Sequence, residues 1–230
     1  MFEGVPEAVA VKAVPNPQAA DRAEAFRLTP VSRETEARLD RFIELLLMWQ
    51  KTTHLISPNT VPMLWTRHVA DSLQLLDLAP SARFWVDLGS GGGFPGLVIA
   101  CALAETPGAQ IHLVESNTRK AAFLREAARL TGAPAVVQAM RMEKYVANFS
   151  LAADAVTARA LLPFKSLLDN SFSILSRGTL GLFPKGQDVA AELTQASKYW
   201  NIDYTLAPSR TDSLARIVVV RGLERRQLPE

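Results

Sequence analysis

The feature that most constrains the fold of this chain is a glycine-rich turn between an apolar segment and a helical one. The segment Phe84–Leu88 is predicted to be a short buried strand, and glycines follow it at positions 89, 91, 92, 93 and 96. Glycine lets the backbone turn sharply out of a strand and lets a ligand approach the main chain closely. The helix predicted over Phe94–Ala104 begins with N–H groups that lack an intrahelical acceptor. This order of elements predicts a ligand-binding α/β unit rather than a plain tight turn.

After residue 81 the sequence alternates between short apolar segments and helical ones. Strands are predicted near 84–88, 111–115, 135–137, 154–158 and 178–184, and helices over 94–104, 118–130, 142–147, 164–175 and 189–199. Such alternation predicts a parallel sheet covered on both faces. Two last strands, near 203–206 and 216–221, have no helical segment between them and are expected to pair antiparallel.

The chain is expected to hold one main domain with shorter flanking segments. We predict a flexible tail over residues 1–30, a helical lid over 31–80, the main domain over 81–223 and a C-terminal tail over 224–230. In the lid, Ser32 is the predicted N-cap of a helix with Leu39 and Phe42 on one face. Pro62 is predicted to begin a second helix that runs to about Leu78.

The composition narrows the class of protein. Apolar residues make up 48% of the 230, enough for a sizeable core, and the net charge of +2 confines any nucleic-acid surface to a local patch. A single cysteine, Cys101, excludes a disulfide framework and a Cys-rich zinc site, and it suits a reducing compartment. No stretch is expected to span a membrane and no signal peptide is recognisable. We therefore expect a cytoplasmic protein without a metal site.

Two acidic residues indicate which ligand the glycine turn binds. Asp87 lies two residues before the first glycine, where its carboxylate can face a cationic amino group but would repel a pyrophosphate. Glu115 ends the second strand and is placed to accept both hydroxyls of a ribose. The spacing Gly91-x-Gly93-x-x-Gly96 also matches a dinucleotide fingerprint, so a nicotinamide-dependent oxidoreductase stays open. S-adenosylmethionine suits the two acids better, because it carries an amino acid and a sulfonium and no phosphate.

Further motifs resemble one known family over about residues 39–221. They are Trp49-Gln50-Lys51, Arg67-His68-Val69-Ala70-Asp71-Ser72, the turn Asp87–Gly96, Arg119-Lys120 with Phe123-Leu124, Arg141-Met142-Glu143, Ala158-Arg159-Ala160 and Lys185-Gly186. The chain thus resembles the bacterial small-subunit ribosomal RNA methyltransferase G family, also called glucose-inhibited division protein B. The resemblance implies a Rossmann-like class I methyltransferase fold, with seven mostly parallel strands and an antiparallel last strand. It also implies methyl transfer from S-adenosylmethionine to N7 of a guanine in the decoding-centre loop of 16S rRNA, as RNA or in the 30S particle.

The resemblance assigns expected roles to individual residues. Gly89 and Phe94 are expected to line the cofactor, Met142 and Glu143 to flank its adenine, and Arg159 to lie where cofactor and substrate meet. With the acids and the turn, the expected cofactor-binding residues are Asp87, Gly89, Gly91, Gly93, Phe94, Glu115, Met142, Glu143 and Arg159. The chain departs from the family pattern over Thr53–Ser57 and at Pro184 before Lys185.

Methyl transfer to guanine N7, as the resemblance implies it, requires few catalytic groups from the protein. N7 carries an in-plane lone pair and no proton, so the reaction needs alignment and a suitable charge environment rather than a general base. Arg159 is accordingly the candidate catalytic residue, acting by position. No Asn-Pro-Pro-Tyr or Asp-Pro-Pro-Tyr segment of the exocyclic-amine methyltransferases follows the fourth strand, and Cys101 is expected to be packing rather than a nucleophile.

Basic residues suggest where RNA binds. The expected RNA-binding residues follow strands or begin a helix, and they are Arg119, Lys120, Lys185 and Arg216. Arg67 and Asp71, four residues apart on a predicted helix, could form an ion pair or belong to an active-site lid with His68. A small-molecule or protein methyltransferase of the same fold and a catalytically silent RNA-binding module remain as alternatives. We expect a monomer.

Overall fold

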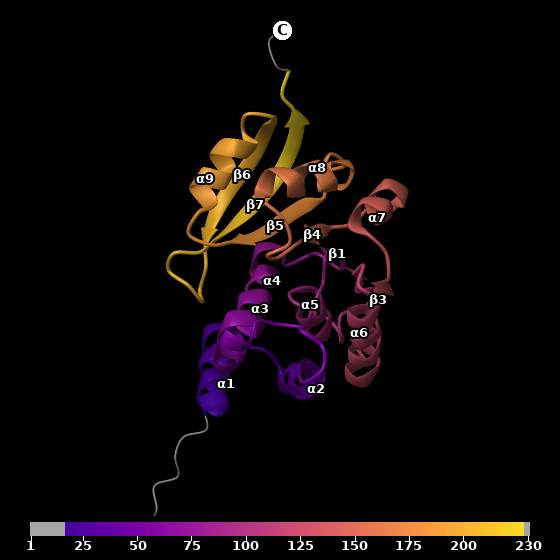
Figure 1. Ribbon diagram of the computed structural model, residues 1–230, viewed down its shortest axis with the longest axis vertical. Coiled ribbons are helices and arrows are strands. Elements are labelled where there is room, and N and C mark those ends of the chain that lie inside the picture. The colour runs from indigo at the N-terminus through magenta and orange to yellow at the C-terminus, as the bar shows by residue number, and fades with distance from the viewer. Residues whose placement is uncertain (1–16, 228–230) are drawn as a thin grey trace, which may run out of the picture.

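The computed structural model describes residues 17–227 and contains a seven-stranded mixed sheet. The strands are β1 (Phe84–Leu88), β2 (Gln110–Val114), β3 (Ala135–Gln138), β4 (Ala155–Thr157), β5 (Leu180–Lys185), β6 (Trp200–Pro208) and β7 (Arg216–Arg225). They are arranged in the order β3-β2-β1-β4-β5-β7-β6 (Figure 1). The first five strands run parallel, whereas β7 is antiparallel to both β5 and β6. The predicted mostly parallel sheet with an antiparallel last strand is confirmed.

Helices cover both faces of the sheet because successive side chains of a strand point to opposite faces. One group comprises α2 (Arg33–Gln50), α5 (Gly96–Ala102) and α6 (Thr118–Thr131), and the other comprises α7 (Met142–Asn148), α8 (Phe164–Leu175) and α9 (Val189–Ala196). Trp85 of β1 belongs to the apolar core of the first group, and its neighbour Val86 belongs to the core of the second. Because β1, β2 and β4 run parallel, their carboxyl ends lie at one edge of the sheet. The glycine turn, Glu115 and Arg159 follow these three strands at that edge.

The N-terminal unit begins earlier than expected. Pro17–Leu28 forms helix α1, so the predicted tail over residues 1–30 is wrong for this segment, and residues 1–16 lie outside the described part. Two of its apolar side chains pack inward: Ala25 is fully buried and Phe26 meets Trp65 edge to face. Ser32 caps α2 as predicted, since its hydroxyl accepts the N–H of Thr35 at 3.2 Å.

The second helix of this unit differs from the expected one. Instead of one helix from Pro62 to Leu78, the chain forms a 3-10 turn η1 (Pro58–Met63) and a π-helical turn η2 (Trp65–Ala70). The short pieces α3 (Asp71–Leu73) and α4 (Leu75–Leu78) complete it. A π-helical turn widens the backbone by one residue and is frequently found at functional sites. Here it carries Arg67 and His68.

At the other end, β7 extends to Arg225, so the predicted tail over 224–230 is wrong for its first two residues. Residues 228–230 lie outside the described part. None of the helices among residues 17–227 is both long and apolar enough to cross a membrane.

Candidate active site

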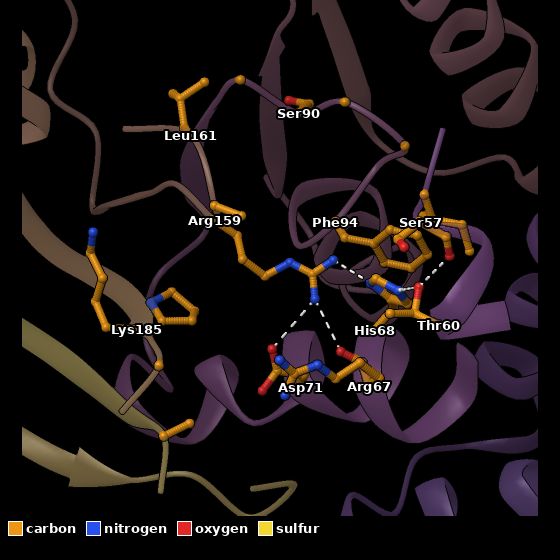
Figure 2. A pocket seen from close by; sticks show the side chains of 18 of the residues that line it. Ser57, Thr60, Arg67, His68, Asp71, Ser90, Phe94, Arg159, Leu161 and Lys185 are labelled. Atoms are coloured by element: carbon orange, nitrogen blue, oxygen red, sulfur yellow. Dashed lines mark hydrogen bonds and ion pairs between the residues drawn. The ribbon is translucent and has the colours of Figure 1, made fainter. Parts of the chain in front are cut away.

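A cleft of about 1020 Å³ opens at the carboxyl edge of the sheet. Its floor contains the glycine turn after β1 and the segment Arg159–Pro163 after β4. Residues of η1 and η2 line a second side, and the end of β5 with the β6–β7 connection lines a third. Ligands of open α/β sheets bind at this edge, so the cleft is the candidate site. Figure 2 shows Arg159 reaching across it toward His68 and Asp71.

Two glycines of the turn are required by its geometry. Gly89 has φ +73° and lines the cleft, and a Cβ there would come within 2.6 Å of the Leu161 side chain. Gly96 begins α5, and a Cβ there would come within 2.6 Å of Asp87. The turn therefore presents bare backbone to the cleft, as close approach of a ligand requires. Gly91 and Phe94 also line the cleft, whereas Gly93 packs below it, near Phe42.

Asp87 lies beneath the turn rather than on the cleft surface. It is 1% exposed, and its Oδ2 accepts the N–H of Gly96 at 3.1 Å, which anchors the start of α5. Its Oδ1 is buried and has no hydrogen-bond partner among the described residues. Burial raises the pKa of this carboxyl to about 6. A buried acceptor left without a partner is costly, so Oδ1 suits a donor that arrives from outside the chain.

Glu115 connects the second strand to the glycine turn. Its Oε2 accepts the N–H of Gly91 at 2.9 Å, and its Oε1 accepts the N–H of Asn117 at 2.7 Å. The residue lines the cleft although it is only 8% exposed. An ionised carboxylate has about four lone-pair positions, so two acceptor positions remain for ligand hydroxyls.

Arg159 is the centre of a cluster that joins β4 to the N-terminal unit (Figure 2). Its Nη1 donates to the carbonyl of Arg67 at 3.1 Å and lies 3.4 Å from Oδ2 of Asp71, and its Nη2 is 2.5 Å from Nδ1 of His68. The guanidinium also lies 5.4 Å from the centre of the Phe94 ring. Asp71 thus pairs with Arg159 and not with Arg67, whose partner is Asp212 at 3.1 Å.

His68 is held in one orientation by contacts on every side. Its Nε2 is 2.8 Å from Oγ1 of Thr60, and its ring lies 4.8 Å from that of Phe94 at an angle of 34°. Burial and the nearby Arg159 and Arg67 lower the pKa of the imidazole to about 3. His68 is therefore neutral, with Nδ1 accepting from Arg159 and Nε2–H donating to Thr60.

The sequence comparisons identify the family of this site. The model of the rRNA small subunit methyltransferase G family matches residues 35–215. This chain belongs to that family. Ribosomal RNA small subunit methyltransferase G of Bradyrhizobium sp. (strain BTAi1) is 58% identical over 207 residues, 90% of this chain and 93% of that protein. The protein of the same name from Rhodopseudomonas palustris (strain BisB5) is 53% identical over 217 residues, 94% and 93% of the two chains.

A solved structure shares the fold at low identity. The O-methyltransferase from Bacillus cereus in complex with SAH aligns with a TM-score of 0.58 and 12% identity, covering 88% of this chain and 97% of that one. The family resemblance drawn from the sequence motifs is thus confirmed by the family match, and the fold by this neighbour.

Some residues expected from the methyltransferase G family lie outside the cleft. Met142 is buried in the core with α7, and Glu143 is exposed on that helix, so neither lines the cleft. Their assignment to the adenine stays a prediction. Arg119 is exposed on α6 just outside, and Lys120 of the same turn lines the cleft.

The two remaining basic residues, Arg216 and Lys185, both line the cleft but differ in their hydrogen-bond and ion-pair partners. Arg216 is partly exposed, and its side chain donates to the carbonyls of Ser213 and Ala215 within its own connection. Lys185 pairs with Glu192 at 2.7 Å and donates to the carbonyl of Leu162 at 3.2 Å. The carboxylate of Glu192 therefore balances the charge of Lys185, and the bond to Leu162 holds the segment after β4 in place.

Cys101 and His112 are both buried away from the cleft. Cys101 is fully buried in α5, and burial raises the pKa of its thiol to about 12, as expected for packing. His112 contacts Tyr145 at 2.6 Å. Residues 17–227 hold no group of three or more His, Cys, Asp or Glu side chains that could bind a metal ion.

Sequence reasoning missed the contributions of Thr60, Leu161 and Glu192 to this methyltransferase G site. Thr60 acts through His68, 8 residues away, and Glu192 acts through Lys185, 7 residues away. Leu161 covers Gly89 from the loop after β4. No local pattern marks such residues. One signal was available for Leu161, because the segment after the fourth strand of this fold faces the same edge as the glycine turn.

Proposed function

We propose that this chain transfers a methyl group from S-adenosylmethionine to N7 of a guanine in the decoding-centre loop of small-subunit rRNA. The observation that carries the proposal is the cleft itself. It brings the glycine turn and Glu115 opposite the Arg159 cluster, while its one lining histidine, His68, is engaged on both nitrogens. Membership of the methyltransferase G family supports the rRNA substrate.

The cofactor half of the cleft fits S-adenosylmethionine. Glu115 retains acceptor positions for two ribose hydroxyls, and Gly89 and Gly91 present backbone without side chains. Oδ1 of Asp87 has no partner among residues 17–227, and a cationic amino group or a water bound beneath the turn would supply one. When bound, S-adenosylmethionine supplies an electrophilic methyl group on a cationic sulfur.

The residues around Arg159 suit methylation of an atom that carries no proton. His68 has an imidazole with a pKa near 3 and both nitrogens in hydrogen bonds, so it is not poised to take a proton. Guanine N7 needs no base, and the protein's contribution is alignment of the nucleophile with the methyl group. The segment after β4 provides that alignment, with Ala160 held at φ +50° between Arg159 and Leu161.

The charge around the reacting atoms is balanced by carboxylates. During the transfer, positive charge moves from sulfur to the guanine ring, and an uncompensated guanidinium nearby would oppose it. Burial lowers the pKa of Arg159, whereas the charges of Asp71 and Asp87 oppose that shift. The pair of Arg159 with Asp71 thus keeps donors in the cleft with little net charge.

The basic rim supports an RNA substrate. Lys120 and Arg216 line the cleft and Arg119 stands beside it, so these three are proposed to contact phosphates. Lys185 adds less attraction because Glu192 balances it. We also propose that the enzyme acts on the rRNA or the 30S particle in the cytoplasm as a monomer.

The proposal is tested on small subunits from a strain that lacks the gene. We expect the protein to methylate one guanine, and the RNA to break there after borohydride reduction and aniline treatment. The rate should change little between about pH 6.5 and 9, because no general base titrates in the reaction. Methyl groups found on an exocyclic amine or a ribose would refute the N7 assignment. Thermal stabilisation by NAD in place of S-adenosylhomocysteine would refute the methyltransferase itself.

A further inference from the structure

The π-helical turn η2 receives its N-terminal cap from a distant helix. Leu64, the residue before the turn, supplies no side-chain cap. Instead Asp21 of α1 accepts the N–H of Trp65 at 2.7 Å and the N–H of Thr66 at 3.3 Å. The hydroxyl of Thr66 donates to the same carboxylate at 2.5 Å. The first N–H groups of a helical turn lack partners within it, so this carboxylate fixes where η2 begins.

Helix α1 is itself held in a defined orientation by Arg22. This side chain forms ion pairs with Glu36 at 2.9 Å and Asp40 at 2.7 Å on α2. Its guanidinium also lies 4.7 Å from the ring centre of Phe26 and 5.4 Å from that of Trp65. Asp21 therefore delivers its carboxylate from a helix that is tied to both α2 and η2. This helix precedes residues 35–215, the range that matches the family.

The two residues after the capped pair both hold Arg159. The carbonyl of Arg67 and Nδ1 of His68 both accept from its guanidinium. Four consecutive residues of η2, Trp65 to His68, thus connect Asp21 on one side to Arg159 on the other. A shift of the turn by a fraction of an ångström would move both acceptors together.

We propose that Asp21 is a positioning residue for methyl transfer, which orients Arg159 through the π-helical turn Trp65–Ala70. The inference rests on one part of the proposed function, namely that Arg159 faces the methyl acceptor. It places part of the active-site machinery in a helix that the sequence alone did not predict. The alternative is that α1 only stabilises the fold, and the experiment separates the two.

The test compares Asp21→Ala and Asp21→Asn with a control on the same helix, Glu24→Ala. Glu24 is a suitable control because its carboxylate makes only an exposed ion pair with Arg27. Total methyl transfer to small subunits is measured at a temperature where all the proteins are folded by circular dichroism. Because misplacement of reacting groups by about 1 Å can cost about 100-fold, we expect Asp21→Ala to lower kcat by about 10- to 100-fold. KM and the affinity for S-adenosylhomocysteine should not change, and Glu24→Ala should behave as wild type.

A second pair of variants keeps the test valid if Asp21→Ala unfolds. Thr66→Val removes the hydroxyl that donates to Asp21, and Thr66→Ser keeps it. We expect Thr66→Val to lower kcat and Thr66→Ser to keep the wild-type kcat. Amide hydrogen exchange should quicken at Trp65–His68 in Asp21→Ala and Thr66→Val while the glycine turn stays protected.

The outcomes are distinct. A wild-type kcat in Thr66→Val and in folded Asp21→Ala, or a loss shared equally by kcat, KM and cofactor affinity, would overturn the positioning role. Because total transfer is counted whatever the acceptor atom, a product other than N7-methylguanine contradicts the proposed function and leaves the test of Asp21 in force.

Discussion

Replacing Asp87 by asparagine should change how the stability of this protein depends on pH. The carboxyl is buried, and one of its oxygens has no partner among residues 17–227. Burial raises its pKa from 3.8 to about 6. Between these two pH values the unfolded chain releases a proton that the folded chain retains. The free energy of unfolding therefore falls as pH rises through this window. Below about pH 3.8 the effect is absent, and above about pH 6 it is complete.

The size of the effect follows from the shift. At 1.36 kcal/mol per pH unit, a rise of about 2 units costs about 3 kcal/mol of stability at neutral pH. Asparagine does not titrate and keeps an acceptor for the N–H of Gly96. The free energy of unfolding of Asp87→Asn minus that of the wild type should thus increase by about 2.4 kcal/mol from pH 4 to pH 7, because the unfolded carboxyl is already partly ionised at pH 4.

Urea unfolding followed by tryptophan fluorescence at a series of pH values measures this difference. Asp212→Asn is the control of opposite sign, because the N–H of Leu214 lowers the pKa of that exposed carboxyl and its contribution is lost on acidification. Saturating S-adenosylhomocysteine should stabilise the wild type more than Asp87→Asn, since a cationic amino group would give the buried carboxylate a partner. Parallel stability curves for Asp87→Asn and wild type across pH 4–7 would show that the pKa of Asp87 is not raised in the folded protein.

Three further predictions concern the cleft. Glu115→Ala should weaken S-adenosylhomocysteine binding by about 1.5–3 kcal/mol, the scale of charged hydrogen bonds, and an unchanged dissociation constant by calorimetry would exclude the ribose role. Arg159→Ala should lower turnover more than RNA binding, and equal losses in both would assign it to binding alone. Lys120→Ala and Arg216→Ala should each reduce the log–log salt slope of RNA binding by about one, and Lys185→Ala by less; unchanged slopes would make the rim an ordinary solvated surface.

Local pattern was sufficient to predict the parallel part of the sheet and the position of the cofactor turn. The alternation of apolar and amphipathic segments predicts β1–β5 and their helices. Each of these elements is recognised from the spacing of apolar residues within its own segment. The glycines after Asp87 and the position of Glu115 mark where two neighbouring strands end. In a parallel sheet those ends share one edge, so the sequence placed Glu115 beside the turn, and the two are joined by the bond from Gly91.

Contacts across long sequence distances were decided only by the tertiary structure. Asp71 lies four residues from Arg67, but it pairs with Arg159, 88 residues away, because packing of η2 against the sheet edge brings them together. Helix α1 has little amphipathic pattern of its own, and it forms because Asp21 and Arg22 find partners on η2 and α2. A sequence shows which side chains carry charge and which segments fold locally. The partner of each charge depends on how the completed elements pack, and so does the pKa of a carboxyl such as Asp87, through its depth beneath the turn.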